Sequence, residues 1–460
     1  MTMAFLDPAA LSRPVYQSLA DQIARAIADG RLANGAQLPP HRILAHELKI
    51  SVQTVSRAYE ELIRRGLVSG ETGRGSFVRR QEPASDVPYL EERPGETIDL
   101  SILKPVCETM HLDRMKAVLA EMAVDLPASA ALSFRPNVIF PGHRAVAVEW
   151  LRHCGVEASP GNVILTNGAT AGMTVAMMSA ASTGTVIATE TLGHHTLVPL
   201  ASYLGLKMAG VAIDDEGMVP EALAALCRQE DVRAVFLQPS PINPSASMMG
   251  LARREALIAV ARENALSIIE NDPLGPLIED RPPPVAALAP ERTLYVTTFT
   301  KSVLPGLRTG YLVAPDRLMP AVANRHLVSH WIATPLLAEV ASRWVRDGTA
   351  MDLVRWQRKA LARRQATVAE MLAGIDHRAH PMGLHVWLPL RSRTEEEVFV
   401  AQARLRGVAL APGRSFQIGR DEHPAVRIAV GSASEAELKA GLRVVAGLYH
   451  AAPEPLLLAI

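Results

Sequence analysis

The first eighty residues carry three short helical patterns of apolar positions. In the first pattern apolar side chains recur every fourth residue, which predicts an amphipathic helix that ends near Gly30. These side chains are Val15, Leu19, Ile23 and Ile27. A shorter pattern then predicts a second helix that turns Ile43, Leu44 and Leu48 inward.

A third helix is predicted to begin after Ser51, whose hydroxyl can accept a free backbone N–H of the first helical turn. Its apolar stripe comprises Val52, Val55, Tyr59 and Leu62. The polar residues outside this stripe, towards solvent or a ligand, are Gln53, Thr54, Ser56 and Arg57. Two further apolar runs, at 67–68 and 76–78, flank a glycine-containing turn and predict a two-stranded hairpin.

Three small helices and a hairpin are the elements of a winged helix-turn-helix. The third helix would then suit the major groove of DNA, and Arg74 at the hairpin tip would suit phosphates or a minor groove. Taken singly, Arg42, Arg57 and Arg74 are equally consistent with solvated surface residues. Taken together they favour DNA binding, because the polar face of the third helix carries Gln, Thr and Arg but few acids.

Beyond a proline-containing stretch the pattern changes to alternating strands and helices. Residues 81–97 include three prolines and few apolar residues, which predicts an extended linker between a domain at 1–80 and another at 98–460. The strand candidates are 163–166, 185–189, 234–238, 267–270, 294–299 and 311–313. Helical patterns at 220–229 and 251–263 lie between them, so we expect an α/β fold with a mostly parallel sheet.

The C-terminal part is predicted to form two lobes. The large lobe should span about 137–317, and the smaller α+β lobe should be formed by the remainder, with strands near 385–390 and 426–430. The run 163–189 has no charged residue and is long enough to cross a membrane. Its glycines, serines and threonines favour a strand, a buried helix and a second strand instead.

Charge and cysteine content exclude several classes of protein. The 47 basic and 47 acidic residues give no net charge, which excludes a uniformly basic nucleic-acid coat. Residues 1–80 nevertheless hold 11 basic and seven acidic residues, so a positive surplus lies where DNA contact is predicted. The three cysteines lie far apart without a CxxC pair. This excludes a disulfide framework or a zinc ribbon, predicts no metal site and fits the reducing cytoplasm.

Candidate chemistry lies at the ends of predicted strands. The turn at 166–170 contains small residues whose free N–H groups could hold a phosphate, and Asn243 lies in a rigid proline-containing turn. The segment 298–310 brings hydroxyls, Lys301 and Arg308 together. A lysine amine can form a Schiff base with an aldehyde cofactor, and hydroxyls with an arginine can bind its phosphate. A lone lysine is usually a solvated charge, but this combination favours a cofactor site.

The N-terminal eighty residues resemble the GntR-type winged helix. The matching points are Gly30-Arg31-Leu32, Leu38-Pro39, Arg42, Leu44-Ala45, Thr54-Val55, Ala58-Tyr59, Leu62, Gly66-Leu67 and Gly73-Arg74-Gly75. Pro40-His41 departs from the family, which usually begins this helix with a small hydroxyl residue. With the helical pattern above, the expected DNA-binding residues are Arg42, Ser51, Gln53, Thr54, Ser56, Arg57, Arg74 and Gly75.

The region from about residue 98 to the C-terminus resembles the fold-type I aminotransferases, which bind pyridoxal 5′-phosphate (PLP). The resemblance implies a large and a small domain and a set of cofactor-binding residues. That set is Gly168, Ala169, Thr170, His194, Asn243, Asn271, Thr298, Thr300, Lys301 and Arg308. Lys301 would be the catalytic lysine of the Schiff base, Asn243 would donate to the phenolic oxygen, and His194 would stack on the ring. Arg427 would pair with the carboxylate of an effector.

The sequence departs from the aminotransferase pattern at Asn271 and Leu274, where the family has a carboxylate and a tyrosine. The carboxylate keeps the pyridine nitrogen protonated, and an amide cannot supply that negative charge. Asp272 is adjacent, but neighbouring side chains of a strand point to opposite faces of the sheet. We therefore expect a site that holds PLP but is a poor transaminase.

A GntR-type winged helix fused to an aminotransferase-like domain is the architecture of the MocR family of transcriptional regulators, which this chain resembles over nearly its whole length. The resemblance implies a homodimer that binds a double-stranded DNA operator, senses PLP or a small amine or amino acid, and has no membrane association. Two alternatives remain. One is an aminotransferase with an appended DNA-binding domain, which would turn over an amino acid with a keto acid. The other is a regulator that has lost PLP, against which Lys301, Arg308 and Asn243 argue.

Overall fold

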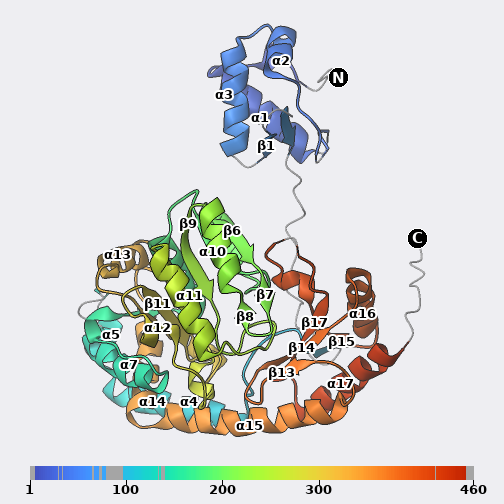
Figure 1. Cartoon of the computed structure of the whole chain (residues 1–460). Coiled ribbons are helices and arrows are strands. Elements are labelled where there is room, and N and C mark those ends of the chain that lie inside the picture. Colours follow the sequence, from blue (N-terminus) through green and yellow to red (C-terminus); the bar gives the residue numbers. More distant parts are fainter. Residues whose placement is uncertain are drawn as a thin grey trace. The chain divides into compact units, whose positions relative to one another are not determined.

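The structure is a computed structural model that describes residues 6–29, 31–33, 35–64, 67–71, 75–78, 97–132, 134–135, 140–419 and 421–451. The chain divides into two compact units, Met1–Glu92 and Arg93–Ile460, and each is described by itself (Figure 1). The linker boundaries stay a prediction, because all of 81–97 except residue 97 lies outside the described residues.

The first unit contains three helices and a hairpin, so the winged helix-turn-helix is confirmed. Its elements are a 3-10 helix at Pro8–Ala10, α1 (Val15–Ala28), α2 (His41–Leu48), α3 (Val52–Arg64), β1 (Val68–Glu71) and β2 (Gly75–Val78). The two strands pair antiparallel, with Val68 opposite Val78. The helices pack into a shared core that includes Leu19, Leu44 and Tyr59.

Two residues predicted to lie in this core are exposed. Ile43 is 53% exposed, because the buried stripe of α2 is formed by Leu44, Ala45 and Leu48. Adjacent helical positions point about 100° apart, so a narrow stripe cannot also include residue 43. Val52 is 43% exposed because it is the first residue of α3 and has helical neighbours on one side only.

The second unit is built around a seven-stranded sheet in the order β4-β12-β11-β10-β9-β5-β6. These strands are β4 (Val163–Thr166), β5 (Val186–Glu190), β6 (Lys207–Val211), β9 (Val232–Leu237), β10 (Ser267–Asn271), β11 (Thr293–Thr298) and β12 (Gly310–Val313). All neighbours are parallel except β12, which runs antiparallel to β11 and β4. The mostly parallel sheet is therefore confirmed, and the six predicted strands are all present.

Helices cover both faces of this sheet (Figure 1). On one face α8 (Gly168–Ala180) buries side chains such as Met177 against the central strands. On the other face α10 (Pro220–Gln229) and α11 (Leu251–Glu263) bury side chains such as Leu257. The uncharged run at 163–189 folds as β4, α8 and β5, as predicted. Within the described part of the chain, no helix is long and apolar enough to cross a membrane.

The small lobe contains a four-stranded sheet in the order β13-β14-β17-β16, and a short parallel pair, β15 with β3. Its elements are β3 (Ile98–Asp99), β13 (Arg378–Ala379), β14 (His385–Pro389), β15 (Val408–Ala409), β16 (Ala411–Pro412), β17 (Ala425–Ala429), α16 (Arg393–Leu405) and α17 (Glu435–His450). The long helix α15 (Thr349–Met371) runs from the large lobe to the small one (Figure 1).

The remaining elements connect or flank these two lobes. They are α4 (Thr109–Asp125), α5 (Ala128–Leu132), α7 (Pro141–His153), α9 (Leu197–Tyr203), α12 (Val285–Leu288), α13 (Met319–His330), α14 (Pro335–Arg346), β7 (Ile213–Asp214), β8 (Gly217–Met218), and 3-10 helices at Pro160–Asn162, Gly275–Leu277, Pro305–Leu307 and Gly413–Phe416.

Candidate cofactor and DNA-binding sites

The predicted cofactor residues gather at the carboxyl ends of strands in the large sheet. Gly168 follows β4, His194 follows β5, Asn243 follows β9, Asn271 ends β10 and Lys301 follows β11. Ligands of open α/β sheets bind at this edge, where the connecting loops leave the strands. The fold therefore brings together residues that are far apart in the sequence.

The turn before α8 has the geometry of an anion cradle. Gly168 opens this helix at φ +79°, a left-handed conformation that favours glycine. A Cβ atom at this position would lie 3.1 Å from Nη2 of Arg308, so the guanidinium lies directly against the first helical turn. The backbone N–H groups of that turn, including those of Ala169 and Thr170, have no acceptor within the helix. Free N–H groups beside a guanidinium suit a phosphate.

The two threonines after β11 have different hydrogen-bonding capacity. The Thr298 hydroxyl donates to the Thr309 carbonyl at 3.0 Å and accepts the Thr300 N–H at 3.2 Å. The Thr300 hydroxyl lies 2.9 Å from that of Thr298. Because the proton of Thr298 goes to the backbone, Thr298 fixes the turn and Thr300 is the donor in the contact between the two hydroxyls. The Thr300 hydroxyl can donate to a ligand only by giving up its bond to Thr298. The Thr170 side chain on α8 is exposed.

Lys301 is largely enclosed, and its Nζ atom donates a hydrogen bond to the main-chain carbonyl of Leu103. Burial, followed by the positive charges of Arg427 and Arg308, lowers the pKa of Lys301 to about 8. No ion pair joins Lys301, Arg308 or Arg427 to a carboxylate within the described ranges. A lysine with this pKa has far more neutral, nucleophilic amine at neutral pH than an exposed lysine.

Arg427 on β17 is a buried cation whose hydrogen-bond acceptors, among the residues that the structure describes, are neutral. Its side chain donates to Oδ1 of Asn243 at 3.0 Å and to the Ser101 carbonyl at 2.6 Å. Its guanidinium carbon lies 4.6 Å from the centre of the Phe416 ring. Burial lowers the pKa of Arg427 to about 10, and the charge of Asp99 opposes that shift. A buried cation with no bonded anion suits the carboxylate of a ligand.

His194 presents a neutral aromatic ring. Its ring stacks on that of His195 with centroids 4.6 Å apart, and its Nδ1 atom accepts the Thr196 N–H at 3.3 Å. Burial, followed by the charges of His195, Lys301 and Arg427, holds the pKa of His194 well below its ordinary value. A neutral imidazole is able to stack on a heteroaromatic ring without adding charge to the site.

The side chain of Asn271 has one oxygen atom without a hydrogen bond. Its Oδ1 atom is buried and has no hydrogen-bond partner among the residues that the structure describes. Its Nδ2 atom lies 3.5 Å from Oε1 of Gln238, and Gln238 in turn donates to the Asn243 carbonyl at 3.2 Å. Gln238 therefore orients Asn271, and no sequence motif marks this residue. Leu274 packs into the hydrophobic core.

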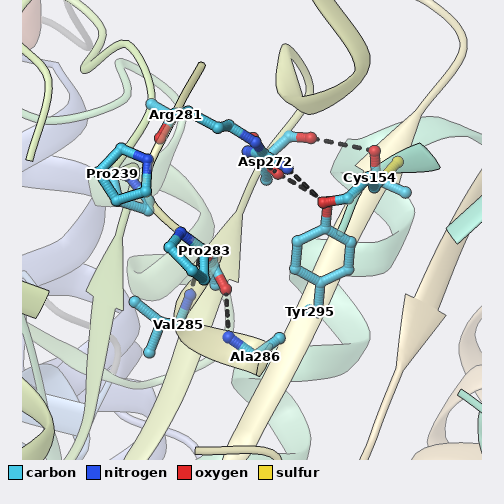
Figure 2. A network of polar contacts seen from close by, with 12 residues as sticks. Cys154, Pro239, Asp272, Arg281, Pro283, Val285, Ala286 and Tyr295 are labelled. Carbon is cyan, nitrogen blue, oxygen red and sulfur yellow. Dashed lines mark hydrogen bonds and ion pairs between the residues drawn. The ribbon is translucent and has the colours of Figure 1, made fainter. Parts of the chain in front are cut away.

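Asp272 does not replace the missing carboxylate (Figure 2). Its Oδ2 atom accepts hydrogen bonds from Arg281 and from the Tyr295 hydroxyl, both at 2.6 Å. Arg281 also donates to the Cys154 carbonyl. This network lies on the opposite face of β10 from Asn271, as alternation along a strand requires. The negative charge is consequently neutralised by Arg281 and held away from the candidate ring position.

The residues present fit a group that carries a phosphate, an aldehyde and a polar ring atom. The first turn of α8 with Arg308 suits the phosphate, Lys301 suits the aldehyde, and the buried carboxamide of Asn271, with its unpartnered Oδ1 atom, suits a polar ring atom. No cluster of three or more metal-ligating side chains occurs among the described residues.

The candidate DNA-binding residues of α2 and α3 divide into exposed and internally bonded side chains. Arg42, Gln53 and Arg57 are exposed. The Ser51 hydroxyl accepts the Thr54 N–H at 3.1 Å, which confirms the predicted helix cap. The Arg57 guanidinium lies 5.5 Å above the ring of Tyr16. A shallow cavity of about 520 Å³ beside it is lined by Arg13, Pro14, Val15, Tyr16, Thr54 and Arg57.

Ser56 does not point to solvent as the sequence predicts, and only part of the predicted hairpin contact can be described. The Ser56 hydroxyl lies 3.0 Å from Nδ1 of His41, so it faces α2 and joins the two helices. Arg74 lies outside the described residues. Gly75 begins β2 at φ +113°, and a Cβ atom there would lie 2.8 Å from Nε2 of Gln37.

Comparisons with known proteins divide the chain in the same way. Residues 120–445 match the aminotransferase class I and II family, and residues 15–78 match the gntR family of bacterial regulatory proteins. The chain is 26% identical to the "Uncharacterized HTH-type transcriptional regulator YdeF" of Bacillus subtilis, covering 94% of each chain. It is 28% identical to the vitamin B6 salvage pathway transcriptional repressor PtsJ of Salmonella typhimurium, covering 91% of this chain and 94% of the relative.

The fold also has a counterpart among solved structures. The kynurenine aminotransferase of Pyrococcus horikoshii superimposes with a TM-score of 0.70 at 21% identity, covering 77% of this chain and 90% of that one. The second unit therefore has the fold of the fold-type I aminotransferases.

Proposed function

Because the chain belongs to the aminotransferase class I and II family over 120–445 and carries a gntR-family region at 15–78, we propose that it is a DNA-binding transcriptional regulator. Its aminotransferase-like domain holds PLP on Lys301 and senses PLP or a small amine or amino acid. The full-length likeness to transcriptional regulators supports this proposal, and the relative named for vitamin B6 salvage supports PLP as an effector.

The observation that carries the cofactor proposal is the set of cations at the strand ends. Lys301, Arg308 and Arg427 lie within electrostatic reach of one another, and none of them has a bonded carboxylate among the described residues. Positive charges that are close together and unpaired raise the energy of a folded protein unless an anion binds them. PLP brings a phosphate, and an amino-acid effector brings a carboxylate, so these ligands supply the missing negative charge.

Each residue then has a role that its surroundings support. When bound, PLP supplies an aldehyde that condenses with primary amines. The N–H groups of the first α8 turn (Gly168, Ala169 and Thr170), with Thr300 and Arg308, hold the phosphate, and Thr298 fixes the turn that carries Thr300. Asn243 donates to the phenolic oxygen, His194 stacks on the ring, and Asn271 bonds to the ring nitrogen. Arg427 binds the effector carboxylate.

The alternative of an aminotransferase with an added DNA-binding domain is not favoured. Asn271 is neutral, and the carboxylates on either side of it are bonded elsewhere. Asp272 accepts hydrogen bonds from Arg281 and Tyr295, and Glu270 accepts the N–H groups of Val285 and Ala286. The side chain at 274 is leucine, which has no hydroxyl to donate to the cofactor. These residues favour retention of the cofactor over turnover.

We further propose that two copies of the chain bind paired half-sites of an operator, each through α3 and the hairpin. Phe134 and Trp331 are 62% and 50% exposed and stack on each other with ring centroids 6.1 Å apart. Such an exposed aromatic pair supports contact with a second copy. The three cysteines, all free, support a location in the cytoplasm.

The test is the visible absorption spectrum of the purified protein with added PLP, measured for the wild type, Lys301→Ala and Lys359→Ala. Lys359 lies on the exposed side of α15 and is the matched control. A Schiff-base band in the wild type and in Lys359→Ala, but not in Lys301→Ala, is expected. The same samples are then titrated with a double-stranded DNA fragment that the full chain has selected from a random pool. DNA affinity that ignores PLP and every amine tested would exclude the sensing role.

A further inference from the structure

A shallow hollow in the first unit lies beside the helix that is expected to bind DNA. The α1–α3 hollow, defined here as the cavity of about 520 Å³ between the start of α1 and the first half of α3, is lined by two arginines and by no acid. Its lining residues are Arg13, Pro14, Val15, Tyr16, Thr54 and Arg57. Neither arginine forms an ion pair within the described ranges. The hollow therefore carries positive charge that no protein carboxylate neutralises.

The faces of α3 follow from the buried position of Val55 in the core of the unit. Successive helical residues are about 100° apart, so Thr54 and Ser56 lie on the two opposite flanks of α3. Gln53, two residues before Val55, lies on the exposed face between these flanks. Arg57 follows Thr54 by three positions, so the two side chains are neighbours on the flank that borders the hollow.

The two flanks of α3 have different neighbours. The Ser56 hydroxyl lies 3.0 Å from Nδ1 of His41, so α2 covers that flank. On the other flank, the guanidinium carbon of Arg57 lies 5.5 Å from the centre of the Tyr16 ring. This cation–π contact draws Arg57 towards α1 and away from the exposed face that carries Gln53. The charge of Arg57 is consequently held at the hollow.

The dimensions of DNA place a phosphate backbone beside each flank of a helix in the major groove. The groove is about 12 Å wide, and a helix with its side chains is about 10–12 Å across, so the helix fills the groove. The walls of the groove are the two phosphodiester backbones, which then lie beside the flanks of the helix. A cation held on the flank of α3 that faces α1 therefore meets a phosphate before it meets a base edge.

We propose that the α1–α3 hollow binds a phosphate of the DNA backbone through Arg13 and Arg57, while Gln53 contacts base edges. The guanidinium group presents N–H donors in a fork that matches phosphate oxygens, and phosphate contacts fix the position of a protein on the duplex without reading its sequence. Tyr16 is a positioning residue, because its ring holds the guanidinium of Arg57. This inference rests on the proposed function, because it requires α3 to bind DNA.

The first experiment measures the affinity of the full chain for the selected DNA fragment at several salt concentrations. A protein that neutralises one phosphate fewer releases fewer counterions, so the slope of log K against log salt should become smaller by about 0.9 in Arg13→Met and in Arg57→Met. Arg25→Met is the matched control, because Arg25 is exposed in the last turn of α1, about 15 Å along the helix from Val15. It should keep the wild-type slope. The wild-type slope in either hollow variant would overturn the proposal.

The second experiment separates phosphate binding from base reading. Fragments with single base-pair substitutions are compared with the selected fragment at one salt concentration. Arg57→Met should weaken binding to every fragment by the same factor, so that its base preference stays that of the wild type. Gln53→Ala should lose preference at one base pair, on the order of tenfold. Loss of preference at a base pair in Arg57→Met would overturn the proposal, because Arg57 would then read a base.

The role of Tyr16 is tested by keeping or removing its ring. Tyr16→Phe keeps the ring against Arg57 and should bind DNA as the wild type does, whereas Tyr16→Leu should bind about threefold more weakly. Wild-type affinity in Tyr16→Leu would overturn the positioning role. Failure of the full chain to select any DNA fragment would overturn the proposed function itself. Selection of a fragment with unchanged slopes in the arginine variants would overturn only the phosphate site.

Discussion

The rate at which PLP condenses with Lys301 should depend on pH in a way set by the surroundings of this amine. Burial, followed by the charges of Arg427 and Arg308, lowers the pKa of Lys301 from the ordinary 10.5 to about 8. Only the neutral amine attacks an aldehyde. At a pH of about 7.4, about a fifth of the amines are neutral at the lower pKa, against roughly 0.1% at the ordinary one. The neutral fraction is therefore roughly 200-fold larger than for an exposed lysine, and condensation should be faster by a smaller factor, because an amine of lower pKa is also a weaker nucleophile.

Stopped-flow absorbance across a range of pH measures this rate directly. Below the pKa of Lys301 the rate should rise about tenfold per pH unit, and above about 8 it should become constant. Arg427→Met removes a neighbouring positive charge, so the pKa of Lys301 rises and the midpoint moves to higher pH. Arg443→Met, at an exposed position of α17, is the control. A midpoint near 10 in the wild type, or the same midpoint in Arg427→Met, would refute this reasoning.

Three further substitutions test individual contacts. Asn271→Asp adds the missing negative charge. The Schiff-base band should then disappear on the order of tenfold faster when amino acids are mixed in. An unchanged rate would show that another residue limits turnover. Gly168→Ala places alanine at φ +79° against Arg308. It should lower the free energy of unfolding by about 1–3 kcal/mol and weaken PLP binding in a titration. Both losses should exceed those of Gly184→Ala, where the added Cβ atom meets open space. Ser51→Ala removes the acceptor of the Thr54 N–H and should lower stability in urea by about 1 kcal/mol and weaken DNA binding; equal stability would contradict the cap.

The large sheet and the strand ends were predictable because apolar runs bounded by turn residues occur at each buried strand. The strand β6 was missed, because its position at the sheet edge leaves its side chains only partly buried and weakens that pattern. In the first unit the helical pattern predicts that Ile43 points inward, but this side chain is exposed. Periodicity identifies a helical face less reliably when the helix has only two turns, as α2 has.

Residues of the candidate site can be predicted from the sequence where they end or directly follow a recognisable strand. They cannot be predicted where the contact joins segments that are far apart in the sequence. Lys301 and Asn271 each follow or end a recognisable strand. The contacts of Ser101 and Leu103 with Arg427 and Lys301 are made by backbone carbonyls, which every residue type carries, so no side-chain pattern marks them. Gln238 was missed because its role depends on the positions of Asn271 and Asn243, which only the folded chain defines.

The same residues that weaken this site as an enzyme suit it as a receptor. Catalysis requires interactions that are stronger in the transition state than in the bound substrate, and a charged partner for the ring nitrogen is one of them. A receptor requires only that one state of the protein bind the ligand better than the other. In the proposed site Lys301 and Arg427 are the residues that would contact the ligand in the state that binds it better. An amide in place of the carboxylate at position 271 is expected to slow turnover, so a bound ligand would persist long enough to favour one state of the protein.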